Sequence, residues 1–380
     1  MVKILVFISE GFYYVSHRRD LLEGLQKIGY NVILVTNIGL LKDEICGSGI
    51  KCIPVDIGRK SLGVFSLLKA SQEYRIIIKS IKPDLIFAVA WKPILAVLIG
   101  TTLFSKVPVL CAFAGLGSAF VESRRSTGVI LARFAIEMLL KHMLNRSGVH
   151  SLFQNNDDRK LFLDKTWTTQ KSSSVISGAG IPLNGVRKEL WPTDAPTRFL
   201  FAGRLLRDKG ISVLINACTI LKQNGFRFEC AIAGFTDASN RSSITEEEIQ
   251  RFHKIGIIKW IGAQKDVMMN MVASDCFVFP TMYREGVPRV LLEASAVGIP
   301  IITTDMPGCR DVVEPYKNGI IIPPGDAIAL ASAMEYCINN RSILKQWGSY
   351  ARKKAEEKYS IEIVIKSHVE IIYGMLGLKI

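Results

Sequence analysis

The chain has 380 residues, of which 49% are hydrophobic and 22% charged. This length suggests two domains of about 100–200 residues each, and the composition excludes a disordered or collagen-like chain. With 48 Lys and Arg against 34 Asp and Glu, the net charge is +14, which favours a polyanionic partner such as nucleic acid, an anionic membrane or a phosphorylated substrate.

Cysteine usage and the apolar runs indicate a cytoplasmic protein. No two of the eight cysteines form a C-x-x-C pair and most lie in apolar runs, as expected of free thiols in a reducing compartment. The apolar run at 2–8 is too short for a signal-peptide core. Residues 85–104 come closest to a membrane span, but Lys92 and Pro93 lie at their centre, so we expect a strand, a turn and a buried helix there.

The first half of the chain alternates short apolar runs with longer amphipathic segments. The apolar runs are nearly continuous in Val, Ile and Leu, which is typical of parallel strands covered by helices on both faces. We expect strands at 2–8, 31–36, 84–89, 107–113, 150–153 and 174–177. We expect helices at 17–29, 64–81 and 128–145.

A polar segment with two prolines, residues 188–198, interrupts this alternation and indicates an interdomain linker. The same alternation of strands and helices then restarts. We expect strands at 198–203, 228–234, 257–262, 276–280, 299–304 and 319–323. We expect helices at 209–224, 245–254, 289–297, 326–339, 342–357 and 361–377.

This order predicts an α/β fold with two doubly wound, Rossmann-like domains facing each other across a cleft. Ligands of open α/β sheets lie outside the carboxyl ends of the strands, so we expect the functional site at such an edge. The expected bounds are 1–187 for the N-terminal domain, 188–198 for the linker, 199–360 for the C-terminal domain and 361–380 for a last helix that could pack back on the N-terminal domain.

The segment 281–298, TMYREGVPRVLLEASAVG, has the features of an anion site. Pro288 suits the first turn of a helix, where its missing N–H costs little. The peptide N–H groups around Val287 would then lie at a helix N-terminus, which attracts anions. Glu285 and Glu293 would be within reach of the hydroxyl groups of a ribose or sugar attached to a bound phosphate. A surface turn followed by a half-exposed helix is the plain alternative.

Basic residues follow the expected strand at 198–203. Gly203 permits a tight turn, and Arg204, Arg207 and Lys209 cluster beyond it. Arginine offers a planar fork to phosphate and lysine a point charge, so this segment could clamp a diphosphate. A solvated run of charges is the alternative.

Two loops of the first half could also approach a ligand. Gly115 and Gly117 follow a strand and would allow close backbone approach. Gly11 lies in the first βα loop, and His17 beyond it could donate to a phosphate, act as an acid or base, or be held in local hydrogen bonds. The first loop lacks G-x-G-x-x-G, which disfavours a nicotinamide-dependent oxidoreductase. No histidine or cysteine spacing indicates a metal site.

The basic excess is concentrated in residues 51–150, which carry 14 basic and 5 acidic side chains. The segment 124–147 has an apolar face with Arg124 and Arg125 at its start. Such a helix could lie on an anionic membrane at about 1 kcal/mol per basic residue, or it could be an ordinary packed helix with a solvated basic face. No nucleic-acid-binding module is recognisable, so nucleic acid is not expected as a partner.

These segments resemble glycosyltransferase family 4, whose members are retaining enzymes of the GT-B architecture. The second half carries the specific motifs: Glu285-x7-Glu293, GRLLRDKG (203–210), IGAQKDV (261–267) and KNGIIIPPGD (317–326). The first half resembles, more loosely, the branch acting on lipid-linked sugars for surface polysaccharide, through WKP (91–93), AGLGSAF (114–120), FQNNDDRKLF (153–162) and SGAGIPLNG (177–185).

The resemblance implies a donor site in the second domain. Glu293 would hold the nucleotide ribose and Glu285 would contact the donor sugar and help to hold it for transfer. Arg204 and Lys209 would bind the diphosphate and stabilise the leaving group, with no metal or other cofactor. The backbone that flanks the sugar phosphate would be that of Gly286, Val287 and Pro288.

The resemblance implies acceptor binding by the basic first domain. Many relatives carry a histidine in the loop after the fifth strand, but this chain reads CAFAGLG there. An acid or hydrogen-bonding role in that loop would therefore pass to His17 or to the backbone. The candidate acceptor and loop residues are Gly11, Gly115, Gly117, Arg124 and Arg125.

The implied activity is that of a hexosyl- or N-acetylhexosaminyltransferase (EC 2.4) at the inner face of the cell membrane. It would move a sugar from a nucleotide diphosphate sugar, with UDP as the expected nucleotide, to a polyprenyl-diphosphate-linked saccharide in the synthesis of O-antigen, capsule or exopolysaccharide. A nucleotide-sugar epimerase of the same fold is one alternative, which the basic first half disfavours. A non-catalytic membrane-associated scaffold is the other, and the intact residues Arg204, Lys209, Glu285 and Glu293 argue against it.

Overall fold

The computed structural model describes residues 1–56, 64–102, 106–115, 137–183, 185, 187–188, 191 and 195–378. The chain forms two compact units, one made of Met1–Gly180 with Ile361–Ile380 and the other of Ile181–Ser360. The expected linker at 188–198 falls inside the second unit. There the backbone N–H of Lys188 donates to the carbonyl oxygen of Val297 over 2.9 Å, so this segment is attached to the unit that follows it.

Within the described residues, the N-terminal unit contains a seven-stranded parallel sheet in the order β3-β2-β1-β4-β5-β6-β7. The order reverses between β1 and β4, as in doubly wound sheets. The strands are β1 (Lys3–Glu10), β2 (Asn31–Asn37), β3 (Lys51–Pro54), β4 (Leu85–Val89), β5 (Val109–Phe113), β6 (Val149–Phe153) and β7 (Ser173–Val175). The helical segments are α1 (Gly11–Tyr13), η1 (Tyr14–Arg18), α2 (Arg19–Lys27), η2 (Gly39–Leu41), α3 (Lys42–Gly47), α4 (Val64–Ile81), α5 (Trp91–Thr101), α7 (Asn156–Asp164) and α15 (Ile361–Leu376).

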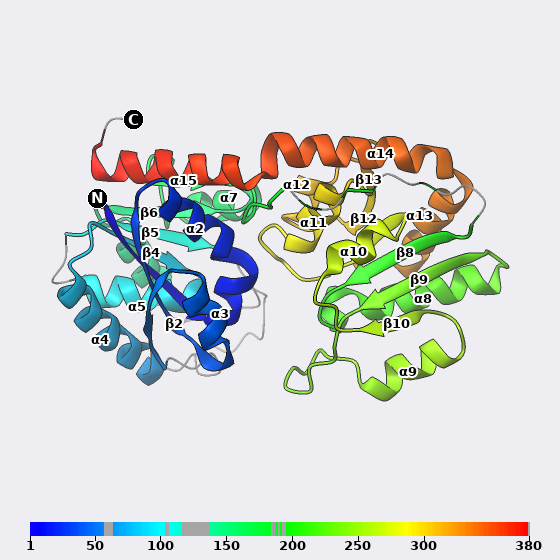
Figure 1. Cartoon of the computed structure of the whole chain (residues 1–380), viewed down its shortest axis with the longest axis horizontal. Helices are drawn as coiled ribbons and strands as arrows, with labels where there is room; N and C mark the ends of the chain where they lie inside the picture. The colour runs from blue at the N-terminus through cyan, green and yellow to red at the C-terminus, as the bar shows by residue number, and fades with distance from the viewer. Residues whose placement is uncertain are drawn as a thin grey trace. The chain divides into compact units, whose positions relative to one another are not determined.

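Helices cover both faces of this sheet (Figure 1). On one face α2 packs against α15, and side chains such as Leu22 and Val364 join the buried cluster above the sheet. On the other face α4 packs against α5, and Tyr74 lies over the ring of Phe7 at 4.2 Å between centroids. The last helix of the chain therefore completes the core of the first unit.

The chain passes from β1 directly into helix, so the expected first βα loop does not exist and the helix begins before the expected His17. Gly11 is the first helical residue. A Cβ there would lie 2.9 Å from the carbonyl oxygen of Asn37 and 2.8 Å from Cδ1 of Ile45. Glycine at this position is explained by the close approach of α1 to the end of β2, and the sequence interpretation of a loop glycine was wrong.

Within the described residues, the C-terminal unit contains a six-stranded parallel sheet in the order β10-β9-β8-β11-β12-β13. This order reverses between β8 and β11. The strands are β8 (Thr197–Ala202), β9 (Phe228–Ala233), β10 (Lys259–Gly262), β11 (Cys276–Phe279), β12 (Ile301–Thr304) and β13 (Gly319–Ile322). The helical segments are η4 (Arg207–Lys209), α8 (Ile211–Gln223), α9 (Glu246–Lys254), α10 (Val267–Val272), α11 (Arg289–Val297), α12 (Cys309–Val312), α13 (Ala327–Asn339), α14 (Arg341–Lys354) and η5 (Ala355–Tyr359).

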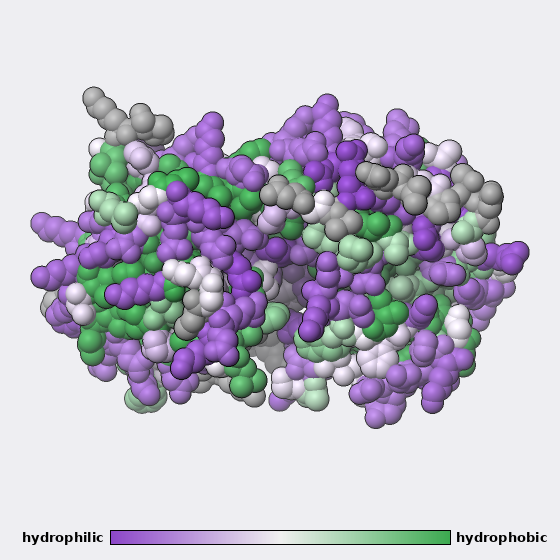
Figure 2. Space-filling model, in the orientation of Figure 1, coloured by the Kyte–Doolittle hydropathy of each residue, from purple (hydrophilic) through white to green (hydrophobic). Residues whose placement is uncertain are grey.

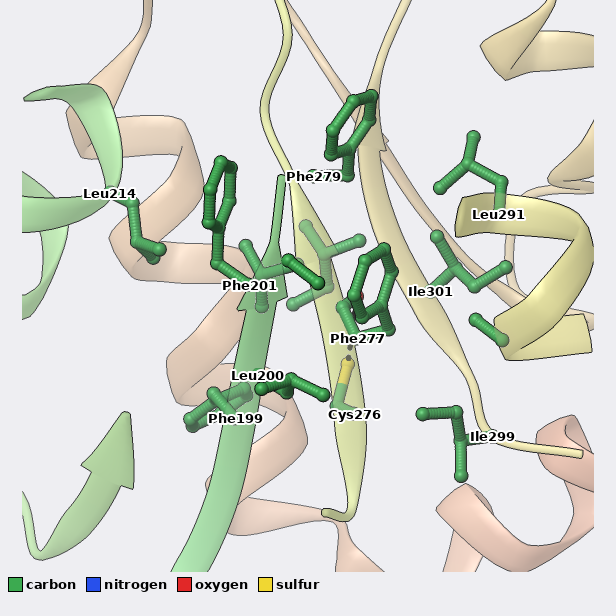
Figure 3. Close-up of a cluster of buried hydrophobic side chains, with 14 of the residues drawn as sticks. Phe199, Leu200, Phe201, Leu214, Cys276, Phe277, Phe279, Leu291, Ile299 and Ile301 are labelled. Carbon is green, nitrogen blue, oxygen red and sulfur yellow. Dashed lines mark hydrogen bonds between the residues drawn. The ribbon is translucent and has the colours of Figure 1, made fainter. Parts of the chain in front are cut away.

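Phenylalanines on β8 and β11 fill the centre of this unit (Figure 3). The rings of Phe201 and Phe279 stack with their centroids 6.1 Å apart, and Phe277 lies beside Phe279 at 6.3 Å. All three are almost fully buried. Since each such side chain contributes roughly 1.5–3 kcal/mol when buried, the two strands that lead into the candidate site are firmly held.

The predicted fold of two doubly wound α/β units is confirmed by both sheet orders. Strand β3 was missed, because its burial pattern is only intermediate and a proline ends it. The predicted helix at 128–145 is described only from 137, where residues 137–144 are helical. In the part of the chain that the structure describes, no helix is both long enough and apolar enough to cross a bilayer.

Candidate functional site

The candidate site lies at the carboxyl ends of β8 and β11, the neighbouring strands between which the second sheet reverses its order. Ligands of doubly wound sheets bind at this point. Gly210, in the segment after β8, has a φ of 80°. A Cβ at Gly210 would lie 1.9 Å from the carbonyl oxygen of Pro280, the residue after β11. Glycine at 210 thus lets the segments that follow the two strands lie against each other.

An ion pair joins these two segments. Lys209 Nζ lies 2.5 Å from Glu285 Oε1, and the two side chains are only 16% and 19% exposed. The hydroxyl of Thr281 lies 3.4 Å from the same carboxylate oxygen. The rings of Phe279 and Tyr283 each have their centroid 5.6 Å from Lys209 Nζ. The ammonium group is therefore fixed at the strand edge by one carboxylate and two aromatic rings.

Arg204 and Arg207 make contacts in different places. Arg204 Nη1 lies 3.5 Å from Asp237 Oδ2, while Arg207 Nη2 lies 2.7 Å from Glu248 Oε2 on α9. Hydrogen bonds from Ser239, together with the charge of Arg204, hold the pKa of Asp237 below its usual value. The predicted cluster of three cations is thus divided among three carboxylates.

Helix α11 provides the expected helix N-terminus. Its first residue is Arg289, so Pro288 is the residue before the helix and not part of its first turn. The first peptide N–H groups of a helix have no partner inside it and carry partial positive charge. The loop before the helix is held by Gly308, which has a φ of 78° and whose Cβ would lie 1.4 Å from the carbonyl oxygen of Gly286. Val287 is buried in this loop.

Glu293 lies on the second turn of α11 and is largely buried. Arg289 Nε donates to Glu293 Oε1 over 3.0 Å. Burial raises the pKa of Glu293, while the charge of Arg289 opposes this rise and that of Asp266 adds to it. A buried carboxylate with one oxygen committed to Arg289 can accept further hydrogen bonds from hydroxyl groups.

The candidates of the first unit also follow strand ends. His17 lies in the π-helical segment η1, with Nδ1 2.6 Å from Ser16 Oγ and its ring stacked on Tyr13 at 4.6 Å between centroids. Gly11 follows β1, and Gly115 follows β5 with a φ of 104°. The remaining candidates lie outside the described residues: Gly117, Arg124 and Arg125.

Three residues of the site were not singled out from the sequence. Arg289 stands four residues before Glu293, a spacing typical of helical ion pairs, and that spacing could have revealed it. Thr281 follows β11 and stands four residues before Glu285, whereas Asp237 follows β9 and only the register of the sheet brings it beside Arg204. Their positions after strands were the sole available signal.

The site combines two basic side chains, a helix N-terminus and two carboxylates. Such a set suits a ligand that carries both phosphate and hydroxyl groups. Burial and the nearby Glu285 raise the pKa of the Cys309 thiol to about 12, so this thiol is not a nucleophile at neutral pH. Among the described residues, no group of three or more His, Cys, Asp and Glu side chains could hold a metal ion.

Two family models match the chain, one in each half. Residues 3–150 match "Glycosyl transferase 4-like" and residues 186–354 match "Glycosyl transferases group 1". The second match contains the whole candidate site, from Gly203 to Gly308. The predicted family resemblance is thereby confirmed.

Individual relatives agree with these matches. The chain is 33% identical to the capsular polysaccharide biosynthesis glycosyltransferase CapM of Staphylococcus aureus over 43% of its own length and 42% of that protein. It is 24% identical, over 96% of its length and 97% of the relative, to N,N'-diacetylbacillosaminyl-diphospho-undecaprenol alpha-1,3-N-acetylgalactosaminyltransferase of Campylobacter jejuni. The chain spans less than half the length of the first two curated relatives it matches.

Solved structures support the fold. The structure of Anabaena HepE in complex with UDP and glucose superimposes with a TM-score of 0.76 at 17% identity, covering 98% of this chain and all of that one. The structure of a glycosyltransferase from Rickettsia africae gives a TM-score of 0.77 at 19% identity over 99% of this chain and 98% of that one. The predicted GT-B fold class is therefore confirmed.

Proposed function

Because this chain belongs to the glycosyltransferases, with a 4-like region followed by a group 1 region, we propose that it transfers a sugar from a nucleotide diphosphate sugar to a polyprenyl-diphosphate-linked saccharide. The donor is a UDP-sugar, the anomeric configuration is retained, and the product is a precursor of a surface polysaccharide. The observation that carries the proposal is the pairing of Lys209 with Glu285 at the reversal point of the second sheet, where Arg204 precedes Lys209 and α11 begins four residues after Glu285.

The donor diphosphate binds between Arg204, Lys209 and the first turn of α11. The diphosphate gains negative charge as its bond to the sugar breaks. Cations and helix N–H groups that are already in position stabilise this charge. The diphosphate displaces the carboxylate of Asp237 from Arg204 and that of Glu285 from Lys209. Glu285, once Lys209 pairs with the diphosphate, accepts hydrogen bonds from hydroxyl groups of the donor sugar.

The nucleoside part of the donor is held at Glu293. This carboxylate lies one turn inside α11, so a phosphate at the helix end places the attached ribose beside it. Arg289 keeps one carboxylate oxygen in place and leaves the other to accept from ribose hydroxyls. We propose that this chemistry needs no metal, because Arg204, Lys209 and the helix end supply the positive charge.

The acceptor part of the proposal concerns the N-terminal unit. The relative from Campylobacter jejuni that aligns over nearly the whole chain is named for a diphospho-undecaprenol acceptor, which supports a lipid-linked acceptor here. On α4, Phe65 is 90% exposed and Ile76 68% exposed, and the basic Lys69 and Lys79 lie on the same helix. Figure 2 shows hydrophobic surface on the side of the molecule where α4 lies. We propose that this unit binds the anionic inner surface of the cell membrane peripherally.

A transfer assay with variants of the diphosphate site tests the proposal. We expect Arg204→Ala to lower turnover by about 10²-fold or more, on the scale of one lost charge-stabilising group. Arg207→Ala is the matched control, because Arg207 pairs with Glu248 on α9 and should leave turnover unchanged. The product linkage, determined by NMR, reports whether the configuration is retained.

Two results would contradict the proposal. Equal turnover of Arg204→Ala and the wild type would remove the diphosphate assignment. Conversion of the nucleotide sugar to its epimer, or failure of every nucleotide sugar to be transferred by a folded protein on membranes, would favour the epimerase or scaffold alternatives.

A further inference from the structure

Arg18 is a buried cation without a counter-charge. It is the last residue of η1, its backbone departs from helical geometry with φ −128° and ψ −8°, and the residue is only 2% exposed. Its Nε atom is buried without a hydrogen-bond partner. Within the described part of the chain, Arg18 forms no hydrogen bond and no ion pair.

Two other buried cations of the described chain have carboxylate partners. Lys188 Nζ lies 3.2 Å from Asp275 Oδ1, and Lys354 Nζ lies 2.9 Å from Glu314 Oε1. A guanidinium cannot escape the cost of burial by losing its proton, because it stays protonated in proteins. Burying an unpaired charge is strongly unfavourable, and the described residues supply no carboxylate that offsets this cost for Arg18.

The buried histidine whose pKa the charge of Arg18 lowers does not supply a counter-charge to Arg18. His368 of α15 is buried, and its Nδ1 donates to the carbonyl oxygen of Val364 over 2.7 Å. Its Nε2 is buried without a partner. Burial, and to a lesser degree the charge of Arg18, lower the pKa of His368 to about 4, so at neutral pH this histidine is uncharged and supplies no anion.

The position of Arg18 fits a ligand with phosphate oxygens. It lies on the helix that follows β1, one of the two strands between which the first sheet reverses its order and beside which ligands of such sheets bind. It ends a π-helical segment, a rare geometry that is frequent at functional sites. The guanidinium is planar and matches two oxygens of a phosphate.

We propose that Arg18 binds a phosphate oxygen of a substrate, and that this phosphate belongs to the diphosphate of the lipid-linked acceptor. The second clause rests on the proposed function, because it assumes that the N-terminal unit takes the acceptor. The missing carboxylate is then explained: the counter-charge of Arg18 arrives with the substrate. The diphosphate of the nucleotide sugar is the other phosphate group that Arg18 could bind.

The test replaces Arg18 by methionine, which has a similar length and no charge. We expect the Tm of Arg18→Met to equal or exceed that of the wild type, because an unpaired buried charge is removed. We expect the KM for the lipid-linked acceptor to rise about 10–100-fold, the scale of one lost hydrogen bond to a charged group, with the KM for the nucleotide sugar unchanged. Arg18→Lys keeps the positive charge but loses the planar guanidinium, so it should give an intermediate KM for the acceptor. This variant replaces Arg18→Met in the test if the methionine variant does not fold.

Arg19→Met is the matched control. Arg19 is the adjacent arginine, and its Nη2 already pairs with Glu44 Oε1 over 2.7 Å. Its loss should leave the KM values for both substrates unchanged. A higher Tm of Arg18→Met with unchanged KM values, or a rise in the nucleotide-sugar KM alone, would overturn the assignment to the acceptor.

A binding measurement separates this inference from the proposed function. Inorganic diphosphate is added to Arg204→Ala, in which the donor site is weakened, and to the double variant Arg204→Ala/Arg18→Met. We expect diphosphate to raise the Tm of the first and not of the second. If the wild type transfers no sugar but this difference is observed, the proposed function fails and the phosphate site at Arg18 stands; equal shifts in both variants would remove the site.

Discussion

At the scale of single residues, the candidate donor site keeps its cations paired with its own carboxylates. Lys209 pairs with Glu285 over 2.5 Å and Arg204 with Asp237 over 3.5 Å. In the proposed function, a donor diphosphate competes with these two carboxylates, which lowers its affinity but leaves the cations already oriented. The oriented charge is what stabilises a leaving diphosphate.

The proposed ribose contact of Glu293 predicts that donor binding depends on pH. Burial holds its pKa above the usual carboxyl value, so it takes up a proton at a pH where exposed carboxylates remain ionised. Because the ribose hydroxyls donate to the ionised form, we expect the donor KM to rise as the pH falls through this raised pKa. In Glu293→Gln the donor KM should be about 10–100-fold higher, on the scale of hydrogen bonds to a charged group, and should lose this pH dependence.

The raised pKa of Glu293 also determines how its contribution to the stability of the fold changes with pH. Since the folded-state pKa of Glu293 lies above the unfolded value, its contribution to stability is fully present below the unfolded pKa and is lost as the pH rises through the folded pKa. Glu293→Gln should thus be at least as stable as the wild type at neutral pH. A pH profile of donor KM that is the same in Glu293→Gln and the wild type would contradict the ribose assignment.

Part of the site could be predicted from single residues and part could not. Glu285, Glu293, Arg204 and Lys209 stand out because ionisable side chains follow strands and open helices. The partner of Arg204 is Asp237, which comes from a different strand end. Local sequence carries no signal for a contact that depends on sheet register, so such partners had to come from the structure.

At the scale of elements, the loop between β11 and α11 is shaped by close backbone packing. Gly308, the residue before α12, has a positive φ and lies so close to the carbonyl oxygen of Gly286 that a Cβ would overlap it. The backbone at 286–288, which we propose to face the donor, thus depends on a glycine more than twenty residues away in sequence.

Gly308→Ala tests this dependence. A Cβ 1.4 Å from the Gly286 carbonyl oxygen forces the loop to move, so we expect several-fold weaker donor binding and a loss of stability larger than backbone strain alone. Gly256→Ala is the control: its φ is 75°, but a Cβ there meets nothing within 4 Å, so it should cost only about 1–2 kcal/mol of strain. Equal Tm values and equal donor affinities for the two variants would show that the packing of Gly308 does not position the loop.

Elements were predicted best where burial is complete on both faces. The strands around Phe7, Phe201 and Phe279 read as continuous apolar runs, and they are the inner strands of their sheets. Strand β3 lies at the edge of its sheet with a partly exposed pattern, so its sequence lacks that signal. The start of the first helix was misplaced because the sequence gives no mark of the contact between Gly11 and the end of β2.

At the scale of the whole molecule, the chain returns at its end to the unit in which it began. The helix α15 supplies Ile361, Val364 and Ile372 to the buried cluster beneath α2. The candidate donor site, in contrast, is built wholly from residues of the second unit. Folding of the first unit and binding of the donor should therefore respond differently to changes at the C-terminus.

Truncation tests this division. We expect removal of residues 361–380 to unfold the first unit, because the loss of several buried side chains at roughly 1.5–3 kcal/mol each is comparable with the total stability of a typical domain. Nucleotide binding by the second unit should persist, as measured by titration, while hydrogen exchange reports the loss of protection in β1–β7. Removal of residues 377–380 alone is the control and should change neither; full protection of β1–β7 in the longer truncation would contradict the role of α15.

The central claim is that a nucleotide diphosphate sugar binds at Arg204, Lys209 and Glu293 without a metal. The most direct test is a thermal-shift panel of UDP, GDP, ADP and CMP and their sugars on the full chain, in EDTA, with Arg204→Ala in parallel. A ligand at 100 times its Kd adds about 2.7 kcal/mol of stability. We predict a selective rise in Tm with UDP and one or more UDP-sugars that is lost in Arg204→Ala; no rise with any nucleotide in a folded sample, or an equal rise in Arg204→Ala, would contradict the claim.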